Sequence, residues 1–407
     1  MPDTTRLYYE DPSMLECDAL VIDVRESGSG ADIVLDRTAF YPEGGGQPCD
    51  LGSLGGLPLL KVFEEDSLVI HRVEGRPSFS AGDRVAMEVD ARRRRDHSQQ
   101  HSGQHLLSAV LERAYGIHTL GFHLGTAYCT IDVSRERMDA SLVEELESKA
   151  DAFIARDCPY RVHVCPPEDP SSFPLLRKKL PQGEDLIRIV EIEAYDWVAC
   201  CGTHVESASE LRALAILYTE RYKGNSRIYF VAGDRAVALL RRHHYFLRES
   251  ALALGTSEEE TPGRISSLLL RGVTLEGERA ALMEERAGME IELALAASRA
   301  EAGTIPAERP LRFSYRDRSA EAAFGTAKAG ASRGLAVVAV SIPDRTVCVM
   351  TPAAAAKQGS IALGALLKPL LQEKGGKGGG GPNSFRAVFG TAQAAEEFAA
   401  AAGSLLA

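Results

Sequence analysis

Two pairs of metal-binding residue types, far apart in the chain, place the strongest constraint on its fold. The first pair is His101 and His105, and the second is Cys200 and His204. Residues four apart on a helix lie one turn apart on the same face, a spacing that suits chelation of one ion. Mixed nitrogen and sulfur ligands favour zinc. We therefore expect a fold that brings the two segments together around one Zn²⁺ per chain.

The ligand set carries two alternatives. His97 precedes His101 by four residues and shares its face if a helix starts early; otherwise His97 lies before the helix, after the basic run Arg92–Arg95, and is solvated. Cys201 competes with Cys200 as the thiolate. A lone His-x-x-x-His is more often ordinary packing, but two pairs in a chain with only 10 histidines favour a metal site.

Length and composition limit the class of protein. A chain of 407 residues is long enough for two or three domains, and 45% hydrophobic with 25% charged residues is typical of a globular protein. The sequence contains no long apolar run and no signal-like start, which predicts a cytoplasmic location. The eight scattered cysteines suggest reduced thiols, one or two of them serving a metal. The net charge of −11 argues against non-specific coating of nucleic acid but allows a local basic groove.

The pattern of the chain predicts an α+β protein in four parts. Residues 1–90 are β-rich, as in a small barrel or sandwich, with strands expected over 19–24, 32–35, 68–73 and 84–89. Residues 91–234 mix helices (91–115 and 141–156) with strands (186–192, 213–218 and 227–232). Residues 235–303 form a helical connector that is broken over 255–263. After a linker over 304–310, residues 304–407 form a small α/β domain, with strands over 311–315, 335–341, 346–350 and 385–389 and a helix over 392–406.

Two glycine-rich segments stand out. The loop from Thr38 to Pro48 holds Gly44, Gly45 and Gly46, which let the backbone approach another group closely. Its flanking Thr38, Tyr41, Pro42, Glu43 and Gln47 are too specific a set for a generic turn. Near the C-terminus, residues 375–383 form a second run around Lys377, which together with Lys374 lacks a nearby acidic partner after Glu373. This run is either a phosphate-binding loop or a flexible turn.

Together these motifs resemble those of the AlaX family, free-standing alanyl-tRNA editing proteins related to the editing domain of alanyl-tRNA synthetase. The family's Thr-x-Phe-Tyr-Pro-x-Gly-Gly-Gly-Gln, His-x-x-x-His and Cys-x-Gly-Thr-His motifs occur here in the family order. The resemblance is strongest over residues 1–235, where Arg188 and residues 223–228 also fit. Residues 375–383 resemble the tail domain of the synthetase and of the long AlaX form, which DHH phosphoesterases share.

The sequence departs from the family pattern at two places. Cys201 stands where the family usually has glycine, which predicts loop strain or a competing thiolate. Ser102 and Gly103 stand where Thr-Ala is common; the hydroxyl is kept, and the glycine is expected to weaken the helix slightly. The resemblance favours Cys200 over Cys201 as the ligand.

The resemblance implies hydrolysis of the ester that joins a wrong amino acid to alanine tRNA, with Ser-tRNA(Ala) or Gly-tRNA(Ala) as substrate. Thr38 is the residue it nominates for the serine hydroxyl, a contact that rejects alanine by leaving polar groups unpaired. Zinc either orders the pocket, which we favour, or activates water if one ligand position is open. The candidate catalytic residues are Thr38 and Gln47, and the metal ligands are His101, His105, Cys200 and His204. The candidate substrate-binding residues are Tyr41, Gly44, Gly45, Gly46, Arg188, Lys223, Arg227 and Lys377.

Other interpretations remain. Tyr222, Lys223 and Arg227, or the run Arg92–Arg95, could contact phosphates, although an arginine run is usually a solvated turn. The chain could also be a zinc-containing tRNA-binding module without hydrolase activity. A DHH-type phosphoesterase is less favoured, because Asp96-His97 is not followed by a second histidine, and the layout argues against a full synthetase. A homodimer through the helical connector and the C-terminal domain is compatible with the sequence, as is helical packing within one chain.

Overall fold

The computed structural model describes the chain except for residues 1–3, 167–172, 174–175, 178–186, 303–308 and 354–361. It is a mixed α+β protein, as predicted. Its contacts form two compact units, Met1–Glu249 and Ser250–Ala407; the division into four parts stays a prediction. Among the described residues, no helix has both the length and the apolarity needed to span a membrane.

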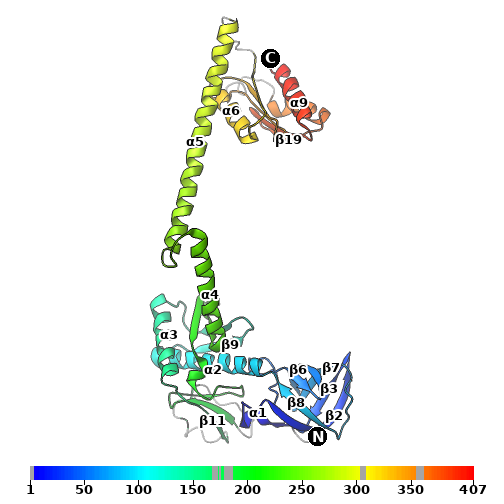
Figure 1. Cartoon of the computed structure of the whole chain (residues 1–407), viewed down its shortest axis with the longest axis vertical. Helices are drawn as coiled ribbons and strands as arrows, with labels where there is room; N and C mark the ends of the chain where they lie inside the picture. The colour runs from blue at the N-terminus through cyan, green and yellow to red at the C-terminus, as the bar shows by residue number, and fades with distance from the viewer. Residues whose placement is uncertain (1–3, 167–172, 174–175, 178–186, 303–308, 354–361) are drawn as a thin grey trace. The chain divides into compact units, whose positions relative to one another are not determined.

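The first unit begins with a six-stranded closed barrel, in the segment where the sequence predicts a barrel or sandwich (Figure 1). Its strands follow the order β2-β3-β7-β6-β5-β8, and every neighbouring pair is antiparallel. Their inward side chains, among them Val21, Ile33 and Val62, form one buried core. A short helix α1 (Leu7–Glu10) and the parallel pair β1 (Thr5–Arg6) and β4 (Arg37–Thr38) complete this part. The barrel strands are β2 (Glu16–Ser27), β3 (Gly30–Leu35), β5 (Gly52–Leu54), β6 (Leu57–Glu65), β7 (Leu68–Glu74) and β8 (Arg84–Val89).

Helix α2 (Ala91–Tyr115) follows the barrel and carries the first histidine pair. It begins where the Asp90 carboxylate accepts a hydrogen bond from the Arg93 amide at 3.0 Å, a standard N-cap, and it ends at Gly116 with φ 64°. The arginine run is therefore helical and not a solvated turn. His97 lies inside the helix and is only 5% exposed, so the helix starts early and the alternative of a solvated His97 ahead of it is wrong.

A four-stranded sheet, in the order β14-β15-β10-β9, packs against α2. Sheet residues Ile131, Ile228 and Phe230 share one buried core with Leu107 and Leu111 of the helix. A second sheet, β11-β12-β13, is followed by the segment that carries the second candidate pair, Cys200 and His204. The elements of this part are β9 (Thr119–Leu124), β10 (Cys129–Val133), α3 (Ala140–Ala155), β11 (Tyr160–Cys165), β12 (Ile187–Ile192), β13 (Asp196–Ala199), the 3₁₀ helix η2 (Ala208–Leu211), β14 (Leu214–Tyr222) and β15 (Asn225–Ala232).

Gly103 is a close-packing position where α2 meets β15. A Cβ atom placed on it would lie 2.6 Å from the Cβ of Ala232, closer than two carbon atoms can approach without a shift. The glycine thus lets the helix lie against the sheet, and its effect is not only the slight weakening of the helix that the sequence predicts.

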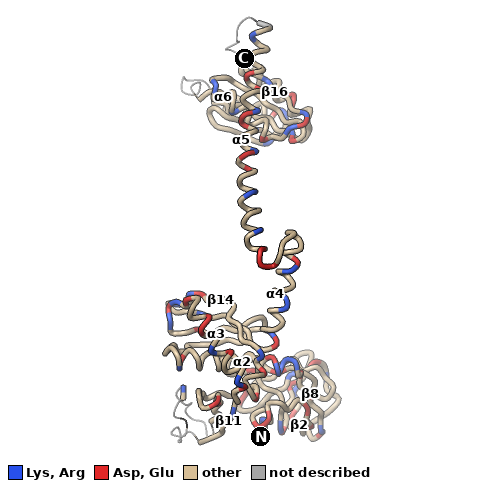
Figure 2. The backbone as a smooth tube through the Cα atoms, turned by 60° about the vertical axis from the view of Figure 1, so that its left-hand side comes forward, with Lys and Arg blue, Asp and Glu red and all other residues tan. Residues whose placement is uncertain are grey.

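Helix α4 (Gly233–Leu254) ends the first unit and enters the second, where α5 (Thr261–Ala302) follows. Basic and acidic residues are interspersed along α5 (Figure 2). The second unit contains a five-stranded sheet in the order β16-β17-β18-β20-β19. Its elements are β16 (Leu311–Tyr315), α6 (Ala320–Ser332), β17 (Val337–Ser341), β18 (Thr346–Met350), α8 (Leu363–Glu373), β19 (Lys377–Gly380), β20 (Ser384–Val388) and α9 (Ala392–Leu405).

The alternating pattern of the second unit produces a mixed sheet. Only β16 and β17, which are joined through α6, are parallel, whereas the other neighbouring pairs are antiparallel. Strands β17 and β18 are antiparallel because only residues 342–345 connect them. A crossover between parallel strands needs a dozen residues or more. The predicted linker over 304–310 lies largely outside the described residues.

The middle of the second glycine run is a strand, where the sequence predicts a loop or turn. Residues Lys377–Gly380 form β19, an edge strand paired with β20. A Cβ on Gly378 would lie 2.1 Å from the Arg386 carbonyl oxygen, and one on Gly380 would lie 2.0 Å from that of Ser384. Only glycine permits these close approaches. Lys377 is exposed, whereas Lys374 does have acidic partners, since its ammonium lies 3.4 Å from Glu397 and 3.7 Å from Glu373.

Candidate metal centre

The four predicted ligands converge, although the two pairs come from different elements. His101 and His105 extend from α2, whereas Cys200 and His204 lie in the segment after β13. One ligand atom from each of the four lies within 4.8 Å of all the others. All three histidines are buried. The cluster could therefore hold a metal ion.

The donor set and its spacing fit a tetrahedral ion. Cys200 Sγ lies 3.4 Å from His101 Nε2 and 3.4 Å from His204 Nε2. Ligand atoms around a four-coordinate zinc lie roughly 3.3–3.8 Å apart, given its bond lengths. Cys201 is exposed and stands outside the cluster, and His97 does not contribute an atom to it. Among the positions that the structure describes, Cys201 is also absent from the residues with positive φ, so its backbone does not adopt the conformation that favours glycine.

Gln47 and Ser102 contact the Nδ1 atoms of His101 and His204 and so orient the two rings. The Gln47 Oε1 atom lies 2.8 Å from His101 Nδ1 and also accepts a hydrogen bond from the Thr203 amide at 3.1 Å. Because Oε1 can only accept, His101 Nδ1 carries the proton and its Nε2 lone pair faces the cluster. Ser102 Oγ lies 3.0 Å from His204 Nδ1. Such outer contacts fix the tautomer that a metal needs.

Burial sets the protonation of the cluster. It lowers the pKa of His101 to about 3, with smaller contributions from Arg188 and His97, and it lowers the pKa of His204 well below its usual value. Burial also raises the pKa of the Cys200 thiol to about 11. At neutral pH both imidazoles are therefore in the neutral form that binds metals.

The glycine-rich loop brings Gln47 to the cluster. Gln47 is 1% exposed, and its Nε2 donates to Thr203 Oγ1 at 3.0 Å. Gly45 and Gly46 have φ values of 56° and 84°, in the left-handed region that favours glycine. On the facing loop, a Cβ on Gly202 would lie 2.2 Å from the His101 ring. Glycine is therefore favoured on the first loop by its backbone conformation and required at position 202 by the close approach of the His101 ring.

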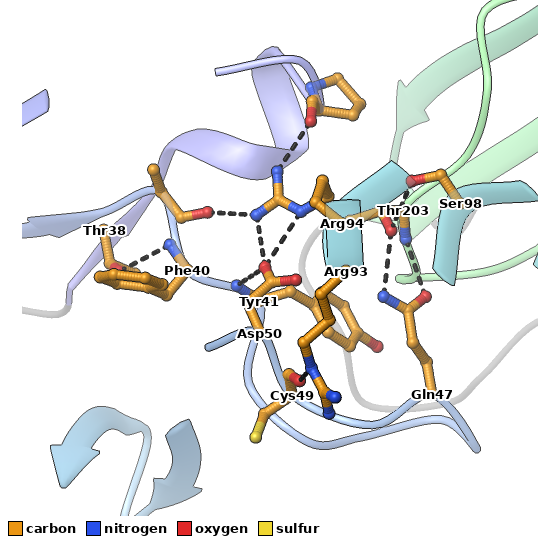
Figure 3. A network of polar contacts seen from close by, with 12 residues as sticks. Thr38, Phe40, Tyr41, Gln47, Cys49, Asp50, Arg93, Arg94, Ser98 and Thr203 are labelled. Carbon is orange, nitrogen blue, oxygen red and sulfur yellow. Dashed lines mark hydrogen bonds and ion pairs between the residues drawn. The ribbon is translucent and has the colours of Figure 1, made fainter. Parts of the chain in front are cut away.

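A buried ion pair anchors the same loop to α2 (Figure 3). Arg94 is 3% exposed and its Nε donates to Asp50 Oδ2 at 3.0 Å, while its Nη2 donates to the Ala39 carbonyl at 2.6 Å. The Tyr41 amide donates to the same carboxylate at 2.8 Å. Arg94 is therefore not available for phosphate contact. The sequence did not predict the contacts made by Arg94, Asp50, Ser98, Ser102 and Thr203. Local signals existed for Ser102 and Thr203, which lie beside His101 and His204 in the two motifs.

Thr38 and Gln47 lie at opposite ends of this network (Figure 3). Thr38 is fully buried, its hydroxyl lies 2.8 Å from His71 Nε2, and it accepts a hydrogen bond from the Phe40 amide at 3.0 Å. His71 Nδ1 faces the Ile33 carbonyl oxygen at 3.2 Å. That oxygen only accepts, so Nδ1 carries the proton and Thr38 donates to Nε2. The structure thus joins Gln47 to the cluster and Thr38 to the barrel core.

The other candidate residues are distributed over both units. Arg188, on β12, is 6% exposed, and its Nη1 donates to the carbonyls of Cys200 and Gly202 at 2.9 and 2.8 Å. Arg227 forms a two-point ion pair with Asp132 and packs on the ring of Tyr222, with its Cζ 3.6 Å from the ring centroid. Lys223 is exposed in the turn between β14 and β15, and Lys377 belongs to the second unit. Tyr41 donates to the Gly44 carbonyl at 3.0 Å and so holds the glycine loop.

Asp96 does not offer a free carboxylate for a DHH-type metal site. Its two oxygens accept hydrogen bonds from Arg235 Nε and Nη2 at 2.7 and 2.6 Å. The ion pair joins α2 to α4, so its role in the structure is to hold the two helices together.

Two segments of the chain match families of tRNA synthetase domains. Residues 187–229 match the family described as threonyl and alanyl tRNA synthetase second additional domain, and residues 5–93 match tRNA synthetases class II (A). The first match spans β12 to β15, with Cys200 and His204, and the second spans the barrel. The segment that holds Cys200 and His204 is thus similar to an added domain of these enzymes, whereas His101 and His105 lie outside both matched segments.

More specifically, the chain resembles alanyl-tRNA editing proteins, as its motifs predict. It is 32% identical over 246 residues to the alanyl-tRNA editing protein Aarsd1 of Danio rerio, covering 60% of this chain and 59% of the relative. It is 34% identical over 239 residues to AlaX-L of Pyrococcus horikoshii, covering 57% and 59%. An alanine–tRNA ligase of Pyrococcus furiosus is 34% identical over 273 residues, 64% of this chain and 29% of the ligase. The match therefore spans less than two thirds of each of these relatives.

Proposed function

We propose that this protein is a trans-editing hydrolase that removes the amino acid from Ser-tRNA(Ala), with Gly-tRNA(Ala) as a second substrate. The observation that carries the proposal is the buried His/Cys cluster, whose His101 is held by Gln47 of the glycine-rich loop. The similarity to proteins named alanyl-tRNA editing protein supports the reaction and the tRNA partner. An enzyme of this kind works where translation takes place, in the cytoplasm.

In this proposal His101, His105, Cys200 and His204 hold one Zn²⁺, which when bound would supply positive charge near the ester and hold the four side chains in place. The remaining chemistry belongs to the chain. Gln47 orients His101, and the backbone of Gly44, Gly45 and Gly46, supported by Tyr41, shapes the pocket wall. The fourfold ligand set favours a metal that orders the pocket over one that activates water.

Thr38 is the proposed source of serine selectivity. Its proton is directed to His71 and one of its lone pairs accepts the Phe40 amide, so the hydroxyl offers only a remaining lone pair. Such a group accepts a hydrogen bond from a serine hydroxyl and has nothing to offer the methyl group of alanine. Because Thr38 is fully buried, this contact requires the aminoacyl end to enter the barrel side of the loop.

We assign RNA contact to Lys223, Arg227 and Lys377. Lys223 and Lys377 are exposed and can meet phosphates directly, whereas Arg227 is already paired with Asp132 and contributes through the aromatic stack with Tyr222. The exposed apolar side chains of α5 support a homodimer through the connector and the C-terminal domain. They include Leu269, Leu270, Val273, Leu282 and Leu293.

The deciding experiment compares deacylation of serine-charged and alanine-charged tRNA(Ala) by the purified protein, with and without a zinc chelator. We expect rapid loss of serine, retention of alanine and loss of activity on chelation. Full activity after complete metal removal would refute a role for the metal. No hydrolysis of either substrate by the zinc-loaded protein would favour the alternative, a tRNA-binding module without hydrolase activity.

A further inference from the structure

Among the residues that the structure describes, the buried cation Arg188 has no carboxylate partner. It is 6% exposed, and the groups whose charges raise its pKa are the thiols of Cys200 and Cys201 and the phenols of Tyr9 and Tyr41. Burial is the largest influence and lowers the pKa of Arg188, but a guanidinium remains charged in proteins. Burying an unpaired charge costs free energy, so this arrangement calls for a partner that the described part of the chain does not supply.

The unused hydrogen-bond donors of Arg188 lie on one edge of its guanidinium. Nη1 donates to the carbonyl oxygens of Cys200 and Gly202. Nε and Nη2 are buried and make no hydrogen bond with any described residue. The Nε and Nη2 edge presents two parallel N–H groups, the geometry that binds two oxygens of a carboxylate or a phosphate side by side.

The two bonds of Nη1 also fix this edge relative to the metal centre. Cys200 is one of the four clustered residues, and Gly202 is the glycine that lies against the His101 ring. The ring of Tyr9 lies 5.6 Å from the Arg188 Cζ atom and covers part of the guanidinium. The free edge is therefore held in one orientation beside the cluster.

The charge balance at this site also favours an anion. A divalent ion held by one thiolate and three neutral imidazoles leaves a net charge of one positive unit, to which Arg188 adds another. In a buried, weakly screened setting such charges attract anions strongly.

We propose that the Nε and Nη2 edge of Arg188 is a binding site for an oxyanion with two adjacent oxygens. The anion is either a backbone phosphate near the 3′ end of the RNA or the carboxylate of the released amino acid. The identity of these two anions rests on the proposed function, whereas the anion site itself follows from the geometry of Arg188.

The test measures binding of inorganic phosphate, L-serine and L-serinamide to the zinc-loaded full-length protein by calorimetry. We compare wild type with Arg188→Lys. Lysine keeps the positive charge and a side-chain N–H donor for the backbone carbonyls, but it lacks the pair of parallel N–H groups. Arg72→Lys is the matched control, because Arg72 uses the same edge on Asp32 at 2.7 and 2.8 Å, away from the cluster. Thermal unfolding and zinc content establish that each variant is folded.

We expect wild type and Arg72→Lys to bind at least one anion, and Arg188→Lys to bind it about tenfold more weakly or worse. Serine binding that is lost with serinamide identifies the carboxylate as the source, and phosphate binding without serine binding identifies the RNA phosphate. Equal binding by Arg188→Lys and wild type, or no binding of either anion by wild type, would overturn the proposal.

A second measurement covers the case in which Arg188→Lys does not fold. An arginine-specific dicarbonyl reagent is applied to wild type with and without inorganic phosphate, and the modified residues are mapped by mass spectrometry. Selective protection of Arg188 supports the site, and equal modification of Arg188 in both samples contradicts it. The deacylation assay is independent of both readouts, so Arg188-dependent anion binding in a protein without hydrolase activity would refute the editing function and leave this site standing.

Discussion

At the scale of single residues, the outer contacts of the cluster matter as much as its ligands. Gln47 uses three of its hydrogen-bonding positions at once, on His101 Nδ1, the Thr203 amide and the Thr203 hydroxyl. It therefore couples the glycine-rich loop to both halves of the cluster. Since His101 can bind a metal through Nε2 only if Nδ1 holds the proton, Gln47 acts as a positioning residue.

The first prediction concerns Gln47→Leu, which removes these contacts at similar size. We expect metal affinity to fall about 10- to 100-fold, measured by competition with a chromophoric chelator. Gln99→Leu is the control. Gln99, on α2, is buried like Gln47. It forms hydrogen bonds with the Glu210 carbonyl and the Asp234 amide and none with the cluster. An equal loss of affinity in both variants would show that the effect is only structural.

His71 gives a prediction for the pH dependence of stability. Burial lowers its pKa to about 4, whereas in the unfolded chain it is about 6.5. Between these values the unfolded chain takes up a proton that the native state does not, so stability falls as the pH falls from about 6.5 to about 4. Over this pH range the titration of His71 lowers the free energy of unfolding by about 3 kcal/mol.

Urea unfolding of wild type and His71→Gln at pH 7.5 and pH 4.5 measures this contribution. We expect the loss of stability on acidification to be smaller in the variant, because glutamine does not titrate. His243→Gln, at an exposed position on α4, should keep the wild-type dependence. A His71→Gln protein with the same acid sensitivity as wild type would assign that sensitivity to other groups.

At the scale of elements, the packing of α2 on β15 positions the first histidine pair. The helix can lie this close to the sheet because Gly103 faces Ala232. Near the start of α2, the ion pair between Arg94 and Asp50 joins the helix to the loop that carries Gln47. The helix is thus held between the barrel and the sheet, and its register decides where His101 and His105 point.

A Gly→Ala comparison tests this close packing. Gly103→Ala should destabilise the protein by about 1–3 kcal/mol through overpacking. Gly272→Ala, in the interior of α5 with no neighbouring atom within 4 Å of the added Cβ, should stabilise by about 0.5–1 kcal/mol through helix propensity. Denaturant unfolding measures both. A neutral or stabilising Gly103→Ala would show that the helix and the sheet can shift apart freely.

At the scale of the whole molecule, the two units divide the proposed work. Every residue of the cluster, with Gln47 and Arg188, belongs to Met1–Glu249, whereas Lys377 belongs to Ser250–Ala407. We therefore predict that removal of residues 304–407 weakens tRNA binding more than it slows deacylation of saturating substrate. Filter binding and single-turnover deacylation measure the two effects. Unchanged tRNA affinity after the deletion would exclude the C-terminal part as an RNA-binding element.

The sequence by itself predicted the candidate ligands and most elements, because both depend on local patterns; the choice of Cys200 over Cys201 came from the resemblance to the family. The spacing of His101 and His105, the motif from Cys200 to His204, and the strands and helices around them follow from residue type and period. Local patterns could not reveal that the Arg94 side chain is buried on Asp50, that Gly103 is a packing position or that residues 377–380 form a strand. Tertiary structure decided these points, since burial, ion pairing and close approach depend on which distant segments meet. For the same physical reason Gln47 and Thr38, neighbours in one motif, have separate surroundings: one contacts the metal cluster and the other contacts His71 in the barrel.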